Sequence, residues 1–470
     1  MKRIAIVGGG ITGLATAFYI EQFARQNDPD SFQIEVFESS NRLGGKIITE
    51  KFEQLTLEMG AESFLARKPW GLQLCKELRI EDSLRSTQPE NKKTFIWHDG
   101  EMHRLPEGLS GFIPASLGAL KSTTLLNLFG KIRIAADLII PASRNSDDES
   151  VAGFISRRIG KQAYERIVEP LLCGIYCANG DEMSLAATFP QLRELERKHG
   201  SLIKGLNAQK NSSKTNSDTS QQLVSPFATF ANGMSTLISA VAEKLQQTQI
   251  HINRPVAQVS NTGERWAMSL TDGTVSEFDE VVLAIPAHHT SKLIREADPD
   301  LAEILLQIPH ASTALLNLWY DAETIDHPLD GYGFVIPTKD QQSLTAVTWT
   351  SSKHYQRCPD NLRLIRAYLG KSGSEITSEH SDDQLWQITN RELQRTMGLT
   401  ASPVDFRIQR WPQGSPQYTM RHPELLSTID NMIETRQGLH LNGASYRGVG
   451  IPDCIRSAKG TADQICSSKK

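Results

Sequence analysis

Cysteine is scarce in this chain of 470 residues, which contains six, at irregular spacings. A small disulfide-stabilised scaffold is therefore excluded, and this usage is typical of a reducing compartment such as the cytoplasm. Cys173 and Cys177 could share a metal ion, but no second Cys or His pair stands at zinc-finger spacing. We therefore expect core thiols and no bound metal.

The sequence also lacks an apolar run long enough to cross a membrane. The nearest candidate, LLNLFGKIRIAADLIIP at 125–141, is interrupted by Gly130, Lys131, Arg133 and Asp137. Its apolar positions recur at helical spacing, which predicts an amphipathic helix packed on a domain core. The alternative is a groove wall or a peripheral contact with the inner face of a membrane. Membrane contact is therefore expected to be peripheral at most.

A large excess of one charge is absent as well. The formal net charge is −4, which gives no reason to expect nucleic acid as a partner. Lys2 and Arg3 lead directly into the apolar stretch IAIVGGG, so no secretory signal is expected and the predicted location is the cytoplasm. The length favours two or three domains over one compact core.

What the sequence does contain is a strand, a glycine turn and a helix within residues 2–23, KRIAIVGGGITGLATAFYIEQF. Gly8, Gly10 and Gly13 match the G-x-G-x-x-G pattern in its required position between strand and helix. Gly8 permits a tight turn, Gly10 a close approach of backbone N–H groups to a pyrophosphate, and Gly13 close packing of helix on strand. The pattern predicts a dinucleotide site.

An acidic residue and a second glycine loop identify the dinucleotide. Glu38 ends the next strand, where its carboxylate can take the ribose hydroxyls of an adenosine and disfavours NADP. The following stretch, ESSNRLGGKIIT, offers Arg42 near phosphate and a second close backbone approach at Gly44 and Gly45. A nicotinamide dehydrogenase has no need of that second loop, so the pair of loops favours FAD.

The remaining pattern is mainly helical from about 70 to 205 and polar at 207–222, where a surface loop or disordered tether is expected. A helix is predicted at 234–247, then consecutive strands with turns at 261–263 and 272–273. His288 and His289 are expected to be loop residues. A helix follows Ser381 as N-cap, and the chain ends with another strand, glycine turn and helix. The first and last units therefore close one domain, with another inserted between them.

Several motifs together resemble the flavin-dependent protoporphyrinogen oxidase family, and most closely its bacterial type that oxidises coproporphyrinogen III. This family belongs to the wider amine-oxidase and phytoene-desaturase superfamily. The resemblance covers nearly the whole chain, and the N-terminal motifs identify only the superfamily. The motifs are VGGGITGL, FES, RLGGK, EMGAESFLARK, the more specific EPLLCGIYCANGDEMSLAATFPQL and RWPQGSPQY, and the terminal NGASYRGVGIPDCI.

The resemblance implies an α/β fold with α+β insertions, built on a Rossmann-like FAD-binding domain of the amine-oxidase type. That domain is expected to comprise 1–70, 226–295 and 430–470. A substrate-binding α+β domain is expected at 71–90 and 296–429, and a mainly helical domain at 91–225, including the polar loop 207–222.

The resemblance also implies which residues bind FAD non-covalently. Gly60 and Ala61 stand where the family often has Gly-Pro, a change that backbone contacts tolerate. The pyrophosphate is expected on Gly8, Gly9, Gly10, Ile11, Thr12 and Gly13, and the ribose on Glu38, with Ser39, Arg42, Gly45 and Lys46 flanking the dinucleotide. Gly60, Ala61, Glu62 and Ser63 are expected to line the flavin, Val256 to meet the adenine through its backbone, and Gly443, Val449, Gly450 and Ile451 to close over the cofactor.

The implied reaction is oxidation of coproporphyrinogen III, protoporphyrinogen IX or both to the porphyrin, in haem biosynthesis, with dioxygen as acceptor and hydrogen peroxide as product. No catalytic side chain is assigned, because the flavin carries the chemistry. The substrate's propionates need cations, and Arg67 is preferred to Lys68 for its carboxylate fork. Tyr176 and Tyr418 are expected to wall the macrocycle. The preferred tetrapyrrole and the oligomeric state stay open.

Three alternatives remain from the sequence. A flavin amine oxidase usually cages its amine between aromatic rings, and Tyr446 is the only aromatic candidate near Val449. A carotenoid desaturase needs a long apolar tunnel, which the cationic FLARKP stretch disfavours. The alternative of another class is a non-catalytic FAD-binding module that docks or regulates.

Overall fold

The computed structural model describes residues 1–106, 108–110, 112–114, 118, 123–145, 147–215, 225–374 and 376–467. The chain forms two compact units. The first comprises Met1–Thr87, Leu223–Pro309 and Glu424–Lys470, and the second comprises Gln88–Gln222 and His310–Pro423. The three-domain boundaries expected from the sequence are a finer division than this one, and they stay a prediction.

A five-stranded parallel sheet forms the centre of the first unit, with strand order β12-β2-β1-β16-β22. Its strands are mostly buried and therefore read as apolar runs, as parallel strands covered on both faces do. This sheet and its crossover helices confirm the α/β fold class, and ligands of such folds bind at the carboxyl ends of the strands. The strands are β1 (Lys2–Val7), β2 (Phe32–Phe37), β12 (Gln249–His251), β16 (Glu280–Leu283) and β22 (Leu439–Leu441).

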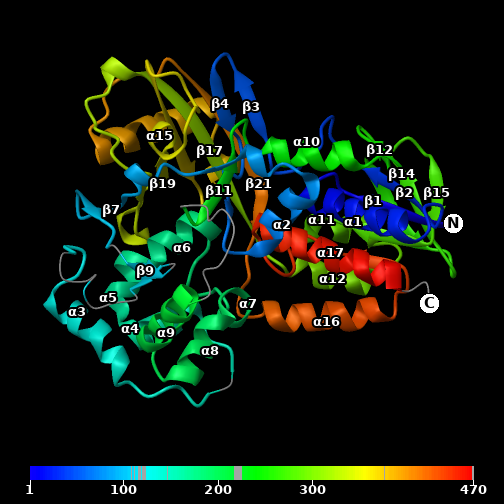
Figure 1. The fold of residues 1–470 in the computed structure, drawn as a ribbon, viewed down its shortest axis with the longest axis horizontal. Coiled ribbons are helices and arrows are strands. Elements are labelled where there is room, and N and C mark those ends of the chain that lie inside the picture. Colours follow the sequence, from blue (N-terminus) through cyan, green and yellow to red (C-terminus); the bar gives the residue numbers. More distant parts are fainter. Residues whose placement is uncertain are drawn as a thin grey trace. The chain divides into compact units, whose positions relative to one another are not determined.

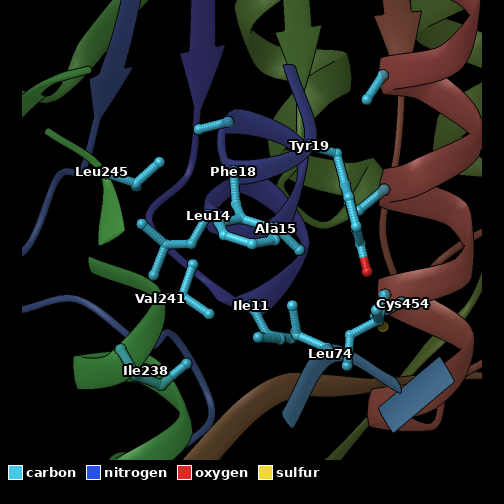
Figure 2. Packing of buried hydrophobic residues seen from close by; sticks show 14 of the residues in the cluster. Ile11, Leu14, Ala15, Phe18, Tyr19, Leu74, Ile238, Val241, Leu245 and Cys454 are labelled. Carbon is cyan, nitrogen blue, oxygen red and sulfur yellow. The ribbon is translucent and has the colours of Figure 1, made fainter. Parts of the chain in front are cut away.

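Helix α1 (Ile11–Asn27) is buried along most of its length because other helices pack on two of its sides. In Figure 2, Ile238 and Val241 of α10 approach α1 from one side, and Cys454 of α17 approaches it from the other. The long contact of α1 with the final helix joins the two ends of the chain in one core (Figure 1). The helices concerned are α2 (Pro69–Leu78), α10 (Ser235–Lys244) and α17 (Ile451–Ser467).

The strands predicted after α10 form an antiparallel meander of β13, β14 and β15, whose turns contain Gly263 and Gly273 at positive φ, as expected. The prediction that His288 and His289 lie in a loop is wrong, because α11 begins directly after Pro286 and contains both. The remaining elements here are β3 (Thr49–Phe52), β4 (Leu55–Glu58), β5 (Phe64–Leu65), β6 (Leu84–Ser86), β11 (Phe227–Phe230), β13 (Val256–Asn261), β14 (Trp266–Leu270), β15 (Val275–Phe278), α11 (Ala287–Ile294), α12 (Pro299–Leu306) and α16 (His422–Glu434).

A seven-stranded sheet, in the order β21-β17-β20-β19-β18-β7-β8, forms one half of the second unit. Helix α15 packs in its apolar core and begins, as predicted, with Ser381 as N-cap in a capping box with Gln384. Strands β7 and β8 lie within the stretch expected to be helical, which is a correction. The elements are β7 (Thr94–His98), β8 (Glu101–Arg104), β17 (His310–Asp321), β18 (Gly333–Val335), β19 (Leu344–Trp349), α13 (Thr350–Lys353), β20 (Leu362–Leu369), α14 (Ile376–Glu379), α15 (Asp382–Met397) and β21 (Asp405–Pro416).

Helices form the other half of the second unit around a separate apolar core. The expected loop at 207–222 is wrong up to Thr215, because α9 continues the helix that begins with the buried Leu202 and Ile203; residues 216–222 lie outside the described residues. The elements are β9 (Leu109–Ser110), β10 (Ile113–Pro114), α3 (Leu128–Ala135), α4 (Val151–Ile159), α5 (Lys161–Ala163), α6 (Glu169–Tyr176), α7 (Leu185–Thr188), α8 (Pro190–His199) and α9 (Leu202–Thr215).

A buried ion-pair cluster, formed by Asp137, Arg157, Arg158 and Glu196, joins these helices. Arg158 is fully buried and donates from Nε to Oδ1 of Asp137 at 2.7 Å, while Arg157 donates to Glu196 at 2.6 Å. Asp137 also accepts from the N–H of Ile203 at 2.9 Å. The cluster therefore fixes α4, α8 and α9 to the segment that follows α3. Among the described residues, no helix has the length and apolar content that a membrane span requires.

Candidate functional site

Two glycine loops of the first unit lie against each other at the carboxyl ends of the central strands. The N–H of Gly44 donates to the carbonyl of Gly9 at 2.8 Å, and Gly10 and Gly44 form an isolated parallel bridge. The loops that the sequence proposes separately for one dinucleotide are thus brought together by backbone atoms. Close backbone approach is the reason glycine is needed here.

Gly13 allows helix α1 to lie directly on the turn that precedes it. A Cβ atom at Gly13 would stand 2.0 Å from the carbonyl oxygen of Gly8, so any side chain would push the helix away. Gly8 itself adopts a φ of +110°, and its N–H donates to the carbonyl of Phe37 at 2.8 Å. The predicted roles of Gly8 and Gly13 in turning and close packing therefore match the geometry.

Helix α1 begins without a side-chain cap, since Gly10 is its N-cap residue. The first-turn N–H groups of Ile11, Thr12 and Gly13 have no partner within the helix, and they carry the positive end of the helix dipole. A phosphate is the ligand that such an end favours. The three predicted pyrophosphate contacts thus lie where an anion can be held.

Glu38 links the first glycine loop to the chain that follows β2. Its Oε2 accepts from the N–H of Gly9 at 2.8 Å, and its Oε1 accepts from the N–H and hydroxyl of Ser40 at 2.8 and 2.7 Å. Each carboxylate oxygen offers two lone pairs, so Oε2 keeps capacity for a ribose hydroxyl. The hydroxyl of Ser39 lies 3.4 Å from Oε1. The N–H of Gly9 and the N–H and hydroxyl of Ser40 therefore fix the orientation of the Glu38 carboxylate.

Arg42 and Lys46 differ in what they contact. The Arg42 guanidinium donates to the carbonyl of Gly45 at 2.9 Å and to that of Leu43 at 3.3 Å, so it braces the second glycine loop. The Lys46 side chain keeps accessible surface, yet its pKa is lowered because the surrounding protein displaces water from the ammonium. A bound anion would offset that loss of solvation.

Open space exists where the predicted cofactor needs it. A Cβ at Gly10 would find its nearest neighbour 4.0 Å away, at Gly45, and a Cβ at Gly443 would meet nothing within 4 Å. Gly443 also has a φ of +120°, a conformation that disfavours other residues. Together with the uncapped α1 and the oriented Glu38, these glycines form a cradle that fits a dinucleotide. The residues present therefore fit FAD.

The chain end contributes Asn442, a residue that the sequence analysis missed. Asn442 is fully buried; its amide donates to Thr461 at 2.9 Å, and its Oδ1 accepts from Ser457 at 2.5 Å. Its Oδ1 also accepts from the N–H of Gly443 at 2.8 Å, which fixes the turn between β22 and α17. The Asn-Gly pair after a strand was the available signal.

Val449, Gly450 and Ile451 lead into α17, whose first turn lies beside that of α1 (Figure 1). Cys454 of α17 and Ile11 of α1 belong to the same apolar core, and burial raises the pKa of the Cys454 thiol to about 11. Cys454 is therefore a neutral packing residue. The contact joins the two helix starts that are predicted to meet the cofactor.

The segments expected at the flavin and the adenine are held in the same unit. Gly60, Ala61, Glu62 and Ser63 follow β4, and the carbonyl of Glu62 accepts from the Thr229 hydroxyl at 2.8 Å. Val256 begins β13, and Arg254, two residues earlier, donates its N–H to the carbonyl of Glu38 at 2.9 Å. Val256 thus lies close to the strand end where the adenosine is predicted.

The candidate substrate residues fall into both units. In the first, Lys68 forms an ion pair with Asp453 of α17, whereas Arg67 is exposed. In the second, the ring of Tyr176 packs edge-on against Phe189, and Tyr418 stacks on His422 at 4.0 Å between ring centroids. A separate hydrogen bond joins the two tyrosine segments, from the Gln417 amide to the carbonyl of Tyr176 at 3.1 Å.

His98, Asp99 and Asp340 form one group of possible metal ligands in the described part of the chain. Asp340 contacts Nδ1 of His98 at 2.6 Å, whereas Asp99 lies 3.1 Å from Nε2. The two carboxylates therefore use opposite edges of one ring, and Lys339 lies 3.4 Å from Nε2. The imidazole therefore links the two carboxylates through its two ring nitrogens.

Comparison with known proteins identifies the family of the chain. The family model for flavin containing amine oxidoreductase matches residues 11–466. The chain is 33% identical to coproporphyrinogen III oxidase of Bacillus subtilis (strain 168), over 97% of this chain and 96% of that one. It is 23% identical to protoporphyrinogen oxidase 2 of Arabidopsis thaliana, over 99% of this chain and 94% of that one.

Among solved structures, a proposed protoporphyrinogen oxidase from Exiguobacterium sp. 255-15 superposes with a TM-score of 0.86. The two chains are 31% identical, and the match covers 100% of this chain and 99% of the other. Likeness of this extent covers both units and the cofactor loops alike. The chain therefore belongs to the flavin containing amine oxidoreductase family, and FAD is its cofactor.

Proposed function

We propose that this chain oxidises coproporphyrinogen III to coproporphyrin III in haem biosynthesis, with dioxygen as the final electron acceptor. The observation that carries the proposal is the full-length likeness to a bacterial coproporphyrinogen III oxidase, at 33% identity. The weaker likeness to a protoporphyrinogen oxidase, at 23%, makes protoporphyrinogen IX the secondary substrate. The proposed location is the cytoplasm, and any membrane contact is peripheral.

The overall reaction removes six electrons and six protons from the macrocycle in three two-electron steps, and three dioxygen molecules become three hydrogen peroxide molecules. When bound, FAD supplies the two-electron acceptor that dioxygen regenerates. The protein's part is to hold the cofactor and to place the substrate. Formation of the aromatic porphyrin makes the three-step oxidation favourable, so no strong general base is required.

In this proposal the cofactor is held mainly by backbone groups. The first turn of α1 takes the pyrophosphate, Glu38 takes the adenosine ribose, and Arg42 keeps the second glycine loop in place. Gly443 leaves room beside the final turn, and Asn442 fixes that turn to α17. The contacts of Glu38, Arg42 and Asn442, together with the open space at Gly443, support these proposed roles.

For the substrate we propose Arg67 as a propionate ligand. Lys68 already neutralises Asp453, whereas the exposed Arg67 guanidinium presents a planar fork that matches a carboxylate. Tyr176 and Tyr418 are proposed as aromatic walls of the macrocycle. The substitution Arg67→Gln should raise KM for coproporphyrinogen III about tenfold with little change in kcat. The exposed Arg295→Gln is the matched control.

An amine oxidase is disfavoured by the place of Tyr446. This residue is 2% exposed and belongs to the apolar core that includes Val281 and Leu439. Burial raises the pKa of its phenol, which has little contact with water. An amine cage needs aromatic faces open to the ligand, so Tyr446 does not supply one.

The experiment is anaerobic mixing of the FAD-loaded protein with coproporphyrinogen III, and separately with protoporphyrinogen IX, while the flavin absorbance is recorded. Bleaching, followed by porphyrin fluorescence and one peroxide per two electrons once air is admitted, is expected. The rate with coproporphyrinogen III should be the larger. A flavin that neither compound reduces would reject the reaction and leave a non-catalytic FAD module; faster reduction by protoporphyrinogen IX would reverse the assigned preference.

A further inference from the structure

An ion pair joins two segments of the first unit that are predicted to line the flavin. The first segment contains residues 60–63 and ends at Lys68, the N-cap residue of α2. The second contains residues 449–451, and Asp453 follows in the first turn of α17. Nζ of Lys68 lies 2.5 Å from Oδ2 of Asp453, although the two residues are 385 positions apart in the sequence. The pair therefore connects the loop after β4 with the end of the chain.

The Asp453 carboxylate lies against the glycine turn that precedes α17. A Cβ atom added to Gly448 would stand 2.6 Å from Cγ of Asp453, and one added to Gly450 would stand 3.1 Å from its Oδ2. Gly448 also has a φ of +127°, a conformation that disfavours other residues. The Asp453 side chain is only 8% exposed. The two glycines therefore leave the space that this carboxylate occupies, and the carboxylate in return fixes the turn.

Packing beside the ion pair holds the starts of α2 and α17 together (Figure 1). A Cβ atom added to Gly71 of α2 would stand 2.7 Å from the Phe64 ring and 3.4 Å from the Pro452 ring. The Arg456 guanidinium lies over the Trp70 ring, 5.0 Å from its centroid. The ion pair therefore belongs to a packed contact between two helices, in which its two side chains are held in place.

Charges of both signs meet at the start of α17, beside the cofactor cradle. Burial raises the pKa of the neighbouring Cys454 thiol most, and the charge of Asp453 raises it further. The charges of Lys46 and Lys68 act in the opposite direction. The pyrophosphate of FAD is itself anionic, so a buried carboxylate without a cation would repel it. Lys68 supplies that cation to Asp453 by direct contact.

We propose that Lys68 is a cofactor-positioning residue, which holds the two predicted flavin segments together through Asp453 and neutralises that carboxylate beside the bound FAD. The carboxylate fixes the turn before α17, and its charge is tolerated next to an anionic cofactor only while Lys68 contacts it. Loss of either residue breaks the same contact, but only loss of Lys68 leaves an unpaired buried anion. The inference rests on FAD and its predicted contacts, and it does not depend on which porphyrinogen is oxidised.

The test is titration of the apoprotein with FAD, followed by flavin fluorescence at low ionic strength and slightly alkaline pH, which keeps an unpaired carboxylate ionised. K68M should raise the dissociation constant of FAD about tenfold, whereas D453N should raise it less than about threefold. K68M/D453N should return to within about threefold of wild type, because the unpaired anion is gone. K68R keeps the charge and should bind FAD like wild type. The matched control K459M removes a lysine that pairs with the exposed Asp463 in α17, and it should bind FAD normally.

The midpoint reduction potential of the bound flavin is a second measurement. K68M should lower this potential, because an unpaired negative charge near the flavin disfavours the addition of electrons. D453N should raise it, because Lys68 then keeps its charge without the carboxylate. A contact that only braced the two segments would not shift the potential in opposite directions in the two variants.

Equal loss of FAD affinity in K68M and D453N, with no recovery in the double variant, would overturn the proposal, as would normal FAD binding by K68M. Unfolding transitions of the apoproteins verify that the variants are folded. If K68M does not fold, the potentials of D453N and wild type decide, because the proposal requires the higher value in D453N. Both measurements are made without porphyrinogen, so failure of this proposal is distinguished from failure of the proposed reaction.

Discussion

The cofactor loops of the first unit and the buried ion-pair cluster of the second join distant segments by different means. In the loops, backbone atoms make the contacts, and glycine is required because any side chain would separate them, as at Gly13 and Gly8. In the cluster, the carboxylate of Asp137 and the guanidinium of Arg158 make the contacts, with both side chains fully buried. The glycine loops require that no side chain fills the space between their backbones, whereas the buried cluster requires that each charged group keeps a partner of opposite charge.

This difference predicts different losses on mutation. A substitution in the glycine loops should weaken FAD binding while the fold survives, since the loops lie at the carboxyl ends of the strands, outside the core of the sheet. A wrong residue in the cluster should weaken the fold, because an unpaired charge would be left in a dry interior. The four variants below test the contrast, from the largest effect to the smallest.

Asp137→Asn should have the largest effect, a loss of about 3–5 kcal/mol in the free energy of unfolding, because the Arg158 charge loses its principal partner while buried. The remaining carboxylate, that of Glu196, lies 3.4 Å from Arg158. Urea unfolding followed by circular dichroism measures the loss. Asp463→Asn, which breaks an exposed pair with Lys459, is the control and should cost less than about 1 kcal/mol. Equal effects of the two variants would contradict the contrast.

Gly13→Ala should come second, with a loss of FAD affinity of roughly a hundredfold, about 2.7 kcal/mol. The new Cβ would meet the Gly8 carbonyl at 2.0 Å and displace the N–H groups that face the pyrophosphate. Titration of the apoprotein with FAD, followed by flavin fluorescence, gives the dissociation constant. Gly460→Ala in α17, where a Cβ meets nothing within 4 Å, is the matched control and should bind FAD normally. Unaltered binding by Gly13→Ala would show that α1 can shift without cost.

Backbone sites of this kind can be predicted from sequence because glycine spacing records where chains must approach closely. The loops at Gly8–Gly13 and Gly44–Gly45 were both predicted, and the structure joins them through Gly9 and Gly44. The Asn-Gly pair at Asn442 indicates a turn after β22, but the side-chain partners of Asn442, which are Ser457 and Thr461, lie in the next helix and give no local pattern. The glycines of the cofactor cradle can therefore be predicted from the sequence, whereas the side chains that support the cradle cannot.

The second unit was predicted less well, for physical reasons. Strand β7 forms a hairpin with β8 across Asp99 and Gly100, a local signal that the sequence offered. Its other partner is the distant β18, where Thr94 lies opposite Gly333, and that pairing has no local pattern. The polar stretch after 207 was expected to be a loop from its composition, yet the helix begun by Leu202 continues through it to Thr215. Asp137 and Arg158 are 21 residues apart, and their pairing has no sequence signature. Contacts between side chains of distant segments are set by packing, which composition does not reveal.

Glu38→Gln should have the third-largest effect, a loss of about 1.5–2 kcal/mol in FAD binding free energy, which is roughly tenfold to thirtyfold in affinity. An amide cannot accept from the N–H groups of Gly9 and Ser40 and the hydroxyl of Ser40 as the carboxylate does. The same fluorescence titration measures it, and the exposed Glu243→Gln is the control. The unfolding free energy of the apoprotein should change less than FAD affinity does. A change in the unfolding free energy that exceeds the change in FAD binding free energy would show that Glu38 stabilises the fold, as the buried ion-pair cluster does.

The smallest effect concerns the pH dependence of the cluster. Burial acts to raise the pKa of Glu196, but hydrogen bonds from Arg157 and the Ser143 N–H outweigh it and hold that pKa below its usual 4.5. The unfolded chain therefore takes up this proton first as the pH falls, so the stabilisation is full above about pH 4.5 and is lost at lower pH. Its slope cannot exceed about 1.4 kcal/mol per pH unit. Unfolding free energies of wild type and Glu196→Gln between pH 7 and 3 should accordingly converge toward the acid end. Parallel curves would show that Glu196 keeps its proton affinity on folding, and that Asp137 alone matches the buried charge.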